Sequence, residues 1–113
     1  MHEPSRGEIW LVDLNPIRGR EQSGKRPVLI ISVDGFNHSA AELIVVLPIT
    51  TKQKNIPLHV ELQQHEGGVT QVSYIKCEDI RSISKERLID YWGSIDDSIM
   101  KKVEFRLRKL LNL

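Results

Sequence analysis

The feature that most restricts the fold of this chain is a series of short strand-like segments that ends in one helical segment. The segments 27–33 and 43–49 are continuous and rich in β-branched residues, as in strands buried on both faces. The segment 56–63 alternates apolar and polar residues, which indicates a strand with one wet face. Further strand-like segments are 8–14, 69–77 and 88–92. We therefore predict a mainly β fold with helices (α+β), in which a C-terminal helix packs on a small barrel or curved antiparallel sheet.

The last segment has the spacing of an amphipathic helix. Ile99, Val103 and Leu107, followed by Leu110 or Leu111, fall on one face, and Met100 extends it. Ser94 and Asp97 resemble a capping box at its start. Basic side chains crowd the rest of the helix, where cations favour the carboxyl end. We expect this basic face to be solvated.

Punctuating residues predict how the other segments end. Pro48 lies near the end of 43–49, so the strand ladder should be broken there or lie at an edge. The segment 34–41 reads as a turn with a short helical piece, and 85–88 as a helical turn capped by Ser84.

Composition excludes several classes of protein. The chain has 113 residues, and we treat 1–113 as a single domain. Its 16 Lys and Arg against 15 Asp and Glu leave a net charge of +1, which argues against binding by bulk charge but not against a local basic groove. Cys77 is the single cysteine, so no internal disulfide can form. Without an apolar signal core or a membrane-length apolar run, we expect a cytoplasmic protein with no membrane contact.

The usual enzyme motifs are missing from the sequence. No Walker or Rossmann glycine motif is present, and we expect no cofactor. The four histidines show no metal-ligand spacing, and alternation places His59 on the wet face of its strand. A metal site made of His59, His65 and Cys77 would depend on an accident of folding, so we predict no metal.

Two polar loops are better candidates for a site. The first, 18–26, holds four cations directly before a buried strand, and the second, 50–54, follows the next buried strand. If these strands are antiparallel neighbours, Arg26 and Thr50 face the same groove. An Arg fork matches the oxygens of a phosphate, and a Thr hydroxyl supplies one more donor. A solvated loop with scattered charges is the alternative at this point.

Specific motifs link these loops to a known family. Residues 6–16 read R-G-E-I-W-L-V-D-L-N-P, 19–29 read G-R-E-Q-S-G-K-R-P-V-L, 47–50 read L-P-I-T and 75–83 read I-K-C-E-D-I-R-S-I. These segments resemble the MazF/PemK toxin family, whose usual pattern includes G-x-E-Q-x-G-x-R-P. The resemblance extends over nearly the whole chain.

The resemblance implies an SH3-like barrel that acts as a homodimer and as the toxin of a type II toxin–antitoxin system. Members of this family are mostly sequence-specific, metal-independent endoribonucleases that cut single-stranded RNA, and a cognate antitoxin neutralises each of them. By resemblance, Arg26 and Thr50 are the catalytic candidates, with Glu21 and Gln22 in a supporting loop. The expected RNA-binding residues are Arg18, Arg20, Ser23, Lys25, Thr51, Lys52 and Lys54.

One motif departs from the family pattern. A branch of the family uses R-C-D-Q-P-R for acid–base chemistry, whereas residues 76–81 here read K-C-E-D-I-R. Lys76 and Glu78 could take these roles, although the Lys point charge does not reproduce an Arg fork. We expect Arg81 to form a structural or interface ion pair. Trp10, Tyr74, Tyr91 and Trp92 could stack on bases, but most should be core or dimer contacts.

Two other functions stay open on the same barrel. One is a CcdB-like toxin that poisons DNA gyrase by binding, which the E-Q-S-G-K-R-P segment argues against. The other is an inactive barrel that binds RNA without cutting it.

Overall fold

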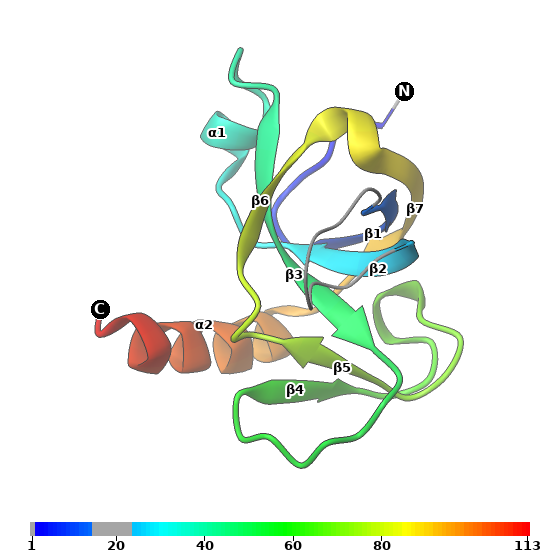
Figure 1. Cartoon of the computed structure of the whole chain (residues 1–113), viewed down its shortest axis with the longest axis vertical. Helices are drawn as coiled ribbons and strands as arrows, with labels where there is room; N and C mark the ends of the chain where they lie inside the picture. The colour runs from blue at the N-terminus through cyan, green and yellow to red at the C-terminus, as the bar shows by residue number, and fades with distance from the viewer. Residues whose placement is uncertain (1, 15–23) are drawn as a thin grey trace.

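The computed structural model describes residues 2–14 and 24–113. Its secondary structure follows the predicted order of strands and a final helix (Figure 1). The elements are β1 (Glu8–Asp13), β2 (Lys25–Ile30), α1 (Asp34–Asn37), β3 (Leu43–Thr50), β4 (His59–Leu62), η1 (Glu66–Gly68), β5 (Ser73–Lys76), β6 (Arg81–Ser84), η2 (Lys85–Arg87), β7 (Leu88–Ser94) and α2 (Asp97–Leu111).

The strands form one curved antiparallel sheet that does not close on itself. Neighbouring strands follow the order β4-β5-β3-β2-β1-β7, and β6 adds to β3 beside this path. In Figure 1, β1, β2, β3, β6 and β7 curve around one end of the molecule, and β4, β5 and α2 lie at the other. This is the SH3-like, mainly β architecture that the sequence predicts.

Pro48 marks the place where β3 changes its partner. On one side, β3 pairs β6 through residues 43–46 and then β5 through Ile49 and Thr50. Pro48 itself is buried and lies opposite Val28 of β2. The predicted break in the ladder is therefore confirmed, whereas an edge position for β3 is wrong: it is the strand with the most partners, because β2, β5 and β6 all pair with it.

Two hydrophobic cores lie on opposite faces of β1, β2 and β3. Consecutive residues of a strand point to opposite faces, so Ile9 and Leu29 enter the core under α2, while Trp10 and Val28 enter the core inside the curved sheet. We call these the outer core and the inner core. This two-sided burial explains the apolar runs 28–30 and 44–49. Val33, at the end of the predicted strand 27–33, lies outside β2 and is exposed.

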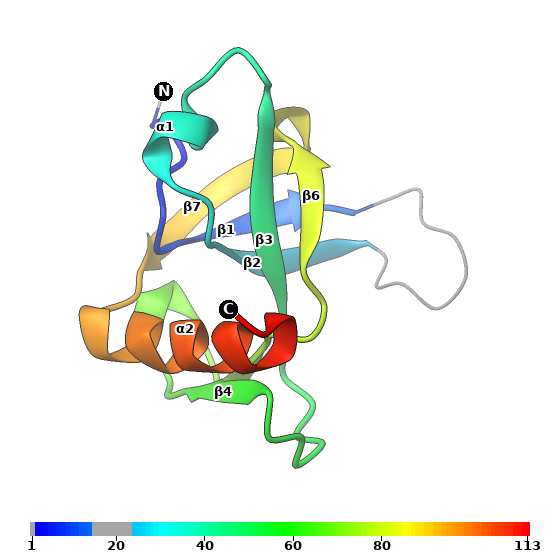
Figure 2. The same cartoon turned by 90° about the vertical axis from the view of Figure 1, so that its left-hand side faces the viewer.

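α2 covers the outer core through its first half. Ile99, Met100 and Val103 are buried, and Figure 2 shows the helix running beside β4. Its N-cap is Asp96, whose carboxylate accepts a hydrogen bond from the Ile99 N–H at 2.9 Å. The predicted Ser94–Asp97 capping box is wrong, because Ser94 still belongs to β7. Leu110 and Leu111 are exposed at the end of the helix.

The N-terminal segment is tied to the rest of the fold. The Arg6 guanidinium lies 2.7 Å from the Glu104 carboxylate of α2 and also donates to the Ile31 carbonyl. The side chain of Ser84 accepts from the Glu86 N–H at the start of η2, which confirms the predicted cap. β6 was not predicted, because its sequence R-S-I-S has only one apolar side chain.

Candidate active site

Residues from neighbouring strands line up in a row on the inner-core side of the sheet. The last pair of the β2–β3 ladder is Val28 with Pro48, and continuing this register by two residues would set Arg26 opposite Thr50. Thr50 is in turn opposite Tyr74 of β5, and Tyr74 is opposite Glu61 of β4. Opposite residues on one face have their Cβ atoms roughly 5 Å apart. The antiparallel neighbours β2 and β3 thus support the predicted meeting of Arg26 and Thr50.

Thr50 is the last residue of β3 and is held in place by its own hydroxyl. The residue is 7% exposed, and its Oγ1 accepts a hydrogen bond from the Lys52 N–H at 3.2 Å. This contact is a short side-chain turn of the kind that Ser and Thr form at strand ends. Because Oγ1 acts as the acceptor there, its own O–H hydrogen can be donated elsewhere.

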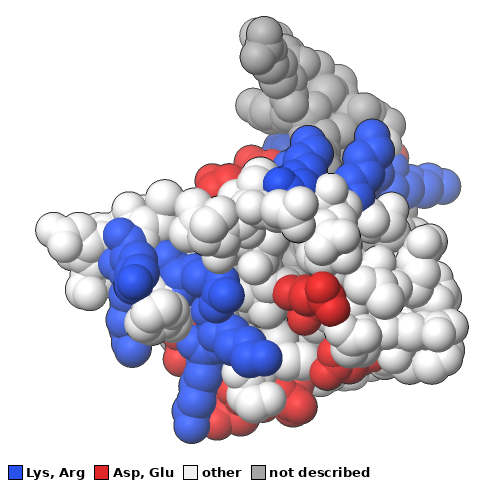
Figure 3. Space-filling model, turned by 90° about the horizontal axis from the view of Figure 1, so that it is seen from below, with Lys and Arg blue, Asp and Glu red and all other residues white. Residues whose placement is uncertain are grey.

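Arg26 and the nearby cations are exposed. Arg26 and Lys25 begin β2, and Thr51, Lys52 and Lys54 follow Thr50 in the irregular segment before β4. In Figure 3, Lys and Arg side chains gather in two groups, one over α2 and the other beside the undescribed atoms. Five predicted site residues lie outside the described part of the chain: Arg18, Arg20, Glu21, Gln22 and Ser23.

Lys76 and Glu78 do not form a pair with each other. The Lys76 ammonium lies 3.4 Å from the Asp79 carboxylate, and its side chain is 15% exposed. The Glu78 carboxylate lies 2.8 Å from His59 Nε2. Each of the two predicted acid–base candidates is therefore held by a different neighbour on this part of the sheet.

The predicted exposure of His59 is wrong. Alternation predicts a water-facing side chain, but the His59 side chain is only 4% exposed. It lies on the same face as Glu61 and opposite Lys76, where the segment 53–56 covers it. The alternation correctly predicts that His59 lies on the same face of β4 as Glu61. It contains no information on whether another segment packs on that face.

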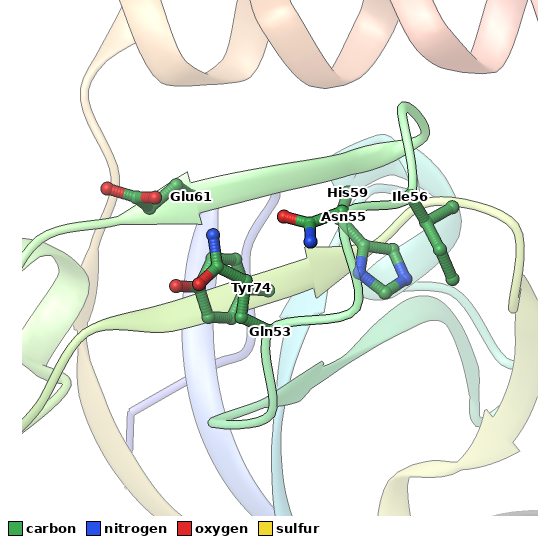
Figure 4. Close-up of a pocket in the computed structure, with 6 residues that line it drawn as sticks. All are labelled: Gln53, Asn55, Ile56, His59, Glu61 and Tyr74. Carbon is green, nitrogen blue, oxygen red and sulfur yellow. The ribbon is translucent and has the colours of Figure 1, made fainter.

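A small pocket opens beside this row of residues. It has a volume of about 160 Å³, and its lining comes from β4, β5 and the segment between β3 and β4 (Figure 4). The lining residues are Gln53, Asn55, Ile56, His59, Glu61 and Tyr74. Tyr74 and Glu61 thus belong both to this pocket and to the row that contains Thr50.

The other aromatic candidates have structural contacts. Trp10 is buried in the inner core, and its Nε1–H donates to the Glu8 carboxylate at 3.0 Å. The Tyr91 ring stacks on His2 with centroids 4.4 Å apart. Trp92 packs against the outer core. Arg81 lies in β6 opposite Val46, and its ion pair stays a prediction.

His59, His65 and Cys77 do not form a metal site in the described part of the chain. No group of three or more His, Cys, Asp or Glu side chains in 2–14 and 24–113 could hold a metal ion. Cys77 is fully buried in the outer core, and this burial raises the pKa of its thiol to about 12. No helix of the same residues is long and apolar enough to cross a membrane.

Comparison with known proteins finds relatives over nearly the whole chain. The chain is 37% identical over 109 residues to the endoribonuclease EndoA of Bacillus subtilis (strain 168), covering 96% of this chain and 94% of that relative. An endoribonuclease from a mycobacterial species, solved in complex with its cognate antitoxin, superposes with a TM-score of 0.81 at 27% identity, over 97% of this chain and 96% of the other. MazF from Deinococcus radiodurans has the same fold, with a TM-score of 0.87 at 24% identity and full coverage of both chains.

These similarities extend along the chain and include both loops of the candidate site. The family model of the PemK-like, MazF-like toxins of type II toxin–antitoxin systems matches residues 5–111. The chain therefore belongs to this family of toxins.

Proposed function

We propose that this toxin is an endoribonuclease that cuts single-stranded RNA with the RNA's own 2′-hydroxyl as the nucleophile. The 2′-oxygen bonds to the adjacent phosphorus and loses its proton, while the bond from phosphorus to the 5′-oxygen breaks and that oxygen gains a proton. The products are a 2′,3′-cyclic phosphate and a 5′-hydroxyl. Alignment of the nucleophile with the phosphorus supplies much of the acceleration, so this step does not call for a metal ion.

The observation that supports the proposal is the antiparallel pairing of β2 with β3, in which Arg26 lies two residues before Val28 and Thr50 two residues after its partner Pro48. Negative charge builds on the phosphoryl oxygens as the 2′-oxygen attacks, and a guanidinium fork fits two of these oxygens. Arg26 stabilises this charge. It stays protonated at all relevant pH values, so its role is electrostatic. The Thr50 O–H donates to the same phosphate.

Proton transfer falls to the remaining candidates. Glu21 or Glu78 accepts the proton of the 2′-hydroxyl, and Gln22 supports the loop that carries Glu21. The Glu78 carboxylate is already oriented by His59. Lys76 is the candidate donor to the leaving 5′-oxygen, because its ammonium carries three donor hydrogens and it lies on the same face of β5 as Tyr74.

Exposed cations and hydroxyls guide the strand to this point. Lys25 precedes Arg26, and Thr51, Lys52 and Lys54 follow Thr50. We assign phosphate contacts to these residues and to Arg18, Arg20 and Ser23 of the preceding loop. Cations concentrated near one site bind the phosphates of the RNA. Because the net charge of the whole chain is only +1, the product can still leave.

The partners follow from the family. Relatives have been solved with a cognate antitoxin, and we propose that this toxin is likewise neutralised by its own antitoxin. Residues 1–113 act as one domain, two copies form a homodimer, and the protein works in the cytoplasm, where mRNA is its substrate.

The test is digestion of mixed RNA by the pure protein with and without a chelator, followed by analysis of the ends. We expect cleavage at all chelator concentrations, with cyclic phosphate and 5′-hydroxyl ends. Activity that the chelator abolishes contradicts the proposed chemistry. RNA that is bound but stays intact supports the inactive barrel, and inhibition of DNA gyrase without RNA cleavage supports the CcdB-like function.

A further inference from the structure

His59 is a buried side chain with one satisfied ring nitrogen and one unsatisfied. Its Nε2 lies 2.8 Å from the Glu78 carboxylate, while its Nδ1 is buried and has no hydrogen-bond partner among the described residues. Nearly all buried polar atoms in folded proteins have a partner. An orphan nitrogen in a side chain that is only 4% exposed therefore points to a group that arrives from outside.

Glu78 determines which kind of group Nδ1 can bind. An ionised carboxylate accepts hydrogen bonds and donates none, so the hydrogen of a neutral His59 ring is on Nε2. In this tautomer the lone pair is on Nδ1, and the tautomer is part of the proposal made below. In Figure 4 one ring nitrogen of His59 lies on the side of Asn55 and Tyr74, where the pocket opens.

The pocket next to His59 has the size of one aromatic ring. Its volume is about 160 Å³, and a cavity of roughly 150 Å³ in another protein takes up one benzene molecule. The Tyr74 ring provides a surface for stacking, and Glu61 adds a second acceptor. Single-stranded RNA is commonly recognised by such stacking together with hydrogen bonds to base edges.

The pocket is adjacent to the candidate active site. Tyr74 lies opposite both Thr50 and Glu61, so the pocket begins one strand away from the catalytic Thr50. A nucleotide next to the cut phosphate could therefore place its base there. Because Nδ1 is covered, side chains of the segment 53–56 must shift when the base enters.

We propose that this pocket selects one base of the RNA substrate, and that His59 Nδ1 accepts a hydrogen bond from an exocyclic amino group of that base. The inference rests on the proposed endoribonuclease function and adds a specificity determinant to it. The acceptors Nδ1 and Glu61 favour adenine, cytosine or guanine over uracil, which presents carbonyl oxygens and a single N–H. Through its contact with His59 Nε2, Glu78 also orients the imidazole ring toward the nucleobase.

The first experiment sequences the ends left by cleavage of a random RNA pool. We expect the wild-type protein to prefer amino-bearing bases at one position of its cleavage site. His59→Phe keeps a planar ring but lacks the acceptor, and should lose this preference by about tenfold, the value of one good hydrogen bond. His65→Asn is the matched control at an exposed histidine with φ of 77°, a conformation that Asn tolerates, and should keep the wild-type profile.

The outcomes separate the two proposals. If the wild-type protein cuts no RNA, the proposed function fails. If it cuts and His59→Phe retains the same base preference, the function stands and the selection by His59 is overturned. Should His59→Phe not fold, as judged by circular dichroism, His59→Leu replaces it, because it also lacks the acceptor and is read in the same way.

A second experiment uses the unaltered protein. The probe is an oligonucleotide of the preferred sequence with 2′-deoxyribose at the cut nucleotide, so that it binds without being cleaved. Long-range ¹H–¹⁵N spectra should show the His59 Nδ1 signal shift as this base arrives. The deaminated oligonucleotide, with uracil for cytosine or hypoxanthine for a purine, should bind about tenfold more weakly and leave Nδ1 unchanged. Equal shifts with both oligonucleotides, or none with either, contradict the proposal.

Discussion

Thr50 lies directly opposite Tyr74 across the β3–β5 ladder. In this part of β3 the neighbouring strand is β5, whereas residues 43–46 pair with β6. This pair joins the two halves of the site. Arg26 is on the neighbouring strand β2, which pairs with β3. Tyr74 is on β5 and lines the pocket. The chemistry and the base recognition that we propose therefore meet at one residue pair.

Replacing Arg26 tests the electrostatic step. Arg26→Ala should lower the rate of RNA cleavage roughly 10²–10³-fold, the usual loss when one donor to a developing charge is removed. Because the residue is exposed, the melting temperature should change little. Arg26→Lys should recover part of the rate through its charge. Wild-type rates in Arg26→Ala would place the active site elsewhere.

We expect the rate of RNA cleavage to depend on the hydroxyl of Thr50 rather than on the shape of its side chain. Thr50→Val keeps the volume but removes both the contact with the Lys52 N–H and the donor to phosphate. We expect cleavage to fall about 10- to 100-fold, as for a lost hydrogen bond to a charged group. Thr50→Ser retains the hydroxyl and should stay near the wild-type rate. Equal rates for the Val and Ser variants contradict the donor role.

The cations that follow Thr50 should contribute to the salt dependence of RNA binding. For single-stranded nucleic acid, each phosphate neutralised contributes about −0.7 to the slope of log K against log salt. Lys52→Ala and Lys54→Ala should each reduce the slope by about this amount without changing the preferred cleavage site. Titrations of a non-cleavable oligonucleotide at several salt concentrations measure it. An unchanged slope removes that lysine from the RNA path.

Much of this fold could be predicted from the sequence, and the reasons for the failures are physical. Strands β2 and β3 stand out because both of their faces are buried, and α2 because its apolar spacing is regular. β6 has too few apolar residues to be recognised, and its pairing with β3 is a long-range contact. The N-cap of α2 is Asp96 rather than Ser94 because β7 extends further than its sequence suggests.

Part of the candidate site could be predicted from the sequence and part could not. Arg26 and Thr50 could be found because their positions follow from two strands and a motif. His59 could not, since its burial depends on the segment 53–56 folding back over β4, and its link to Glu78 joins residues that are far apart in the sequence. The alternation of 56–63 contains no information about either contact.

A tight backbone contact predicts a stability effect far from the site. Gly68 has φ of +87°, and a Cβ placed there would lie 2.3 Å from the Trp92 carbonyl oxygen. Gly68→Ala should cost at least about 2 kcal/mol through strain and backbone displacement, and should lower the melting temperature by roughly 10 °C. Gly35→Ala is the control, because no atom lies within 4 Å of the added Cβ. Equal melting temperatures would contradict the contact.

Cys77 predicts a pH effect in the alkaline range. Burial raises the thiol pKa from its ordinary value of 9.0 to about 12 in the folded protein. Between these two values the unfolded chain loses the thiol proton while the folded protein keeps it, so the thiol lowers stability as the pH rises. Cys77→Ser or Cys77→Ala should flatten this part of the stability curve, measured by urea unfolding. Native protein should also react slowly with iodoacetamide at pH 9, and denatured protein quickly.

The change of partner at Pro48 has a consequence for how toxins of this shape diverge. Strands β4 and β5 are joined to the rest of the sheet through β3 alone. Substitutions of pocket-lining residues on β4 and β5 alter the pocket but do not touch the residues of the inner core. If this pocket selects a base as we propose, a few substitutions on β4 and β5 should change which RNA sequences are cut without altering Arg26 or Thr50.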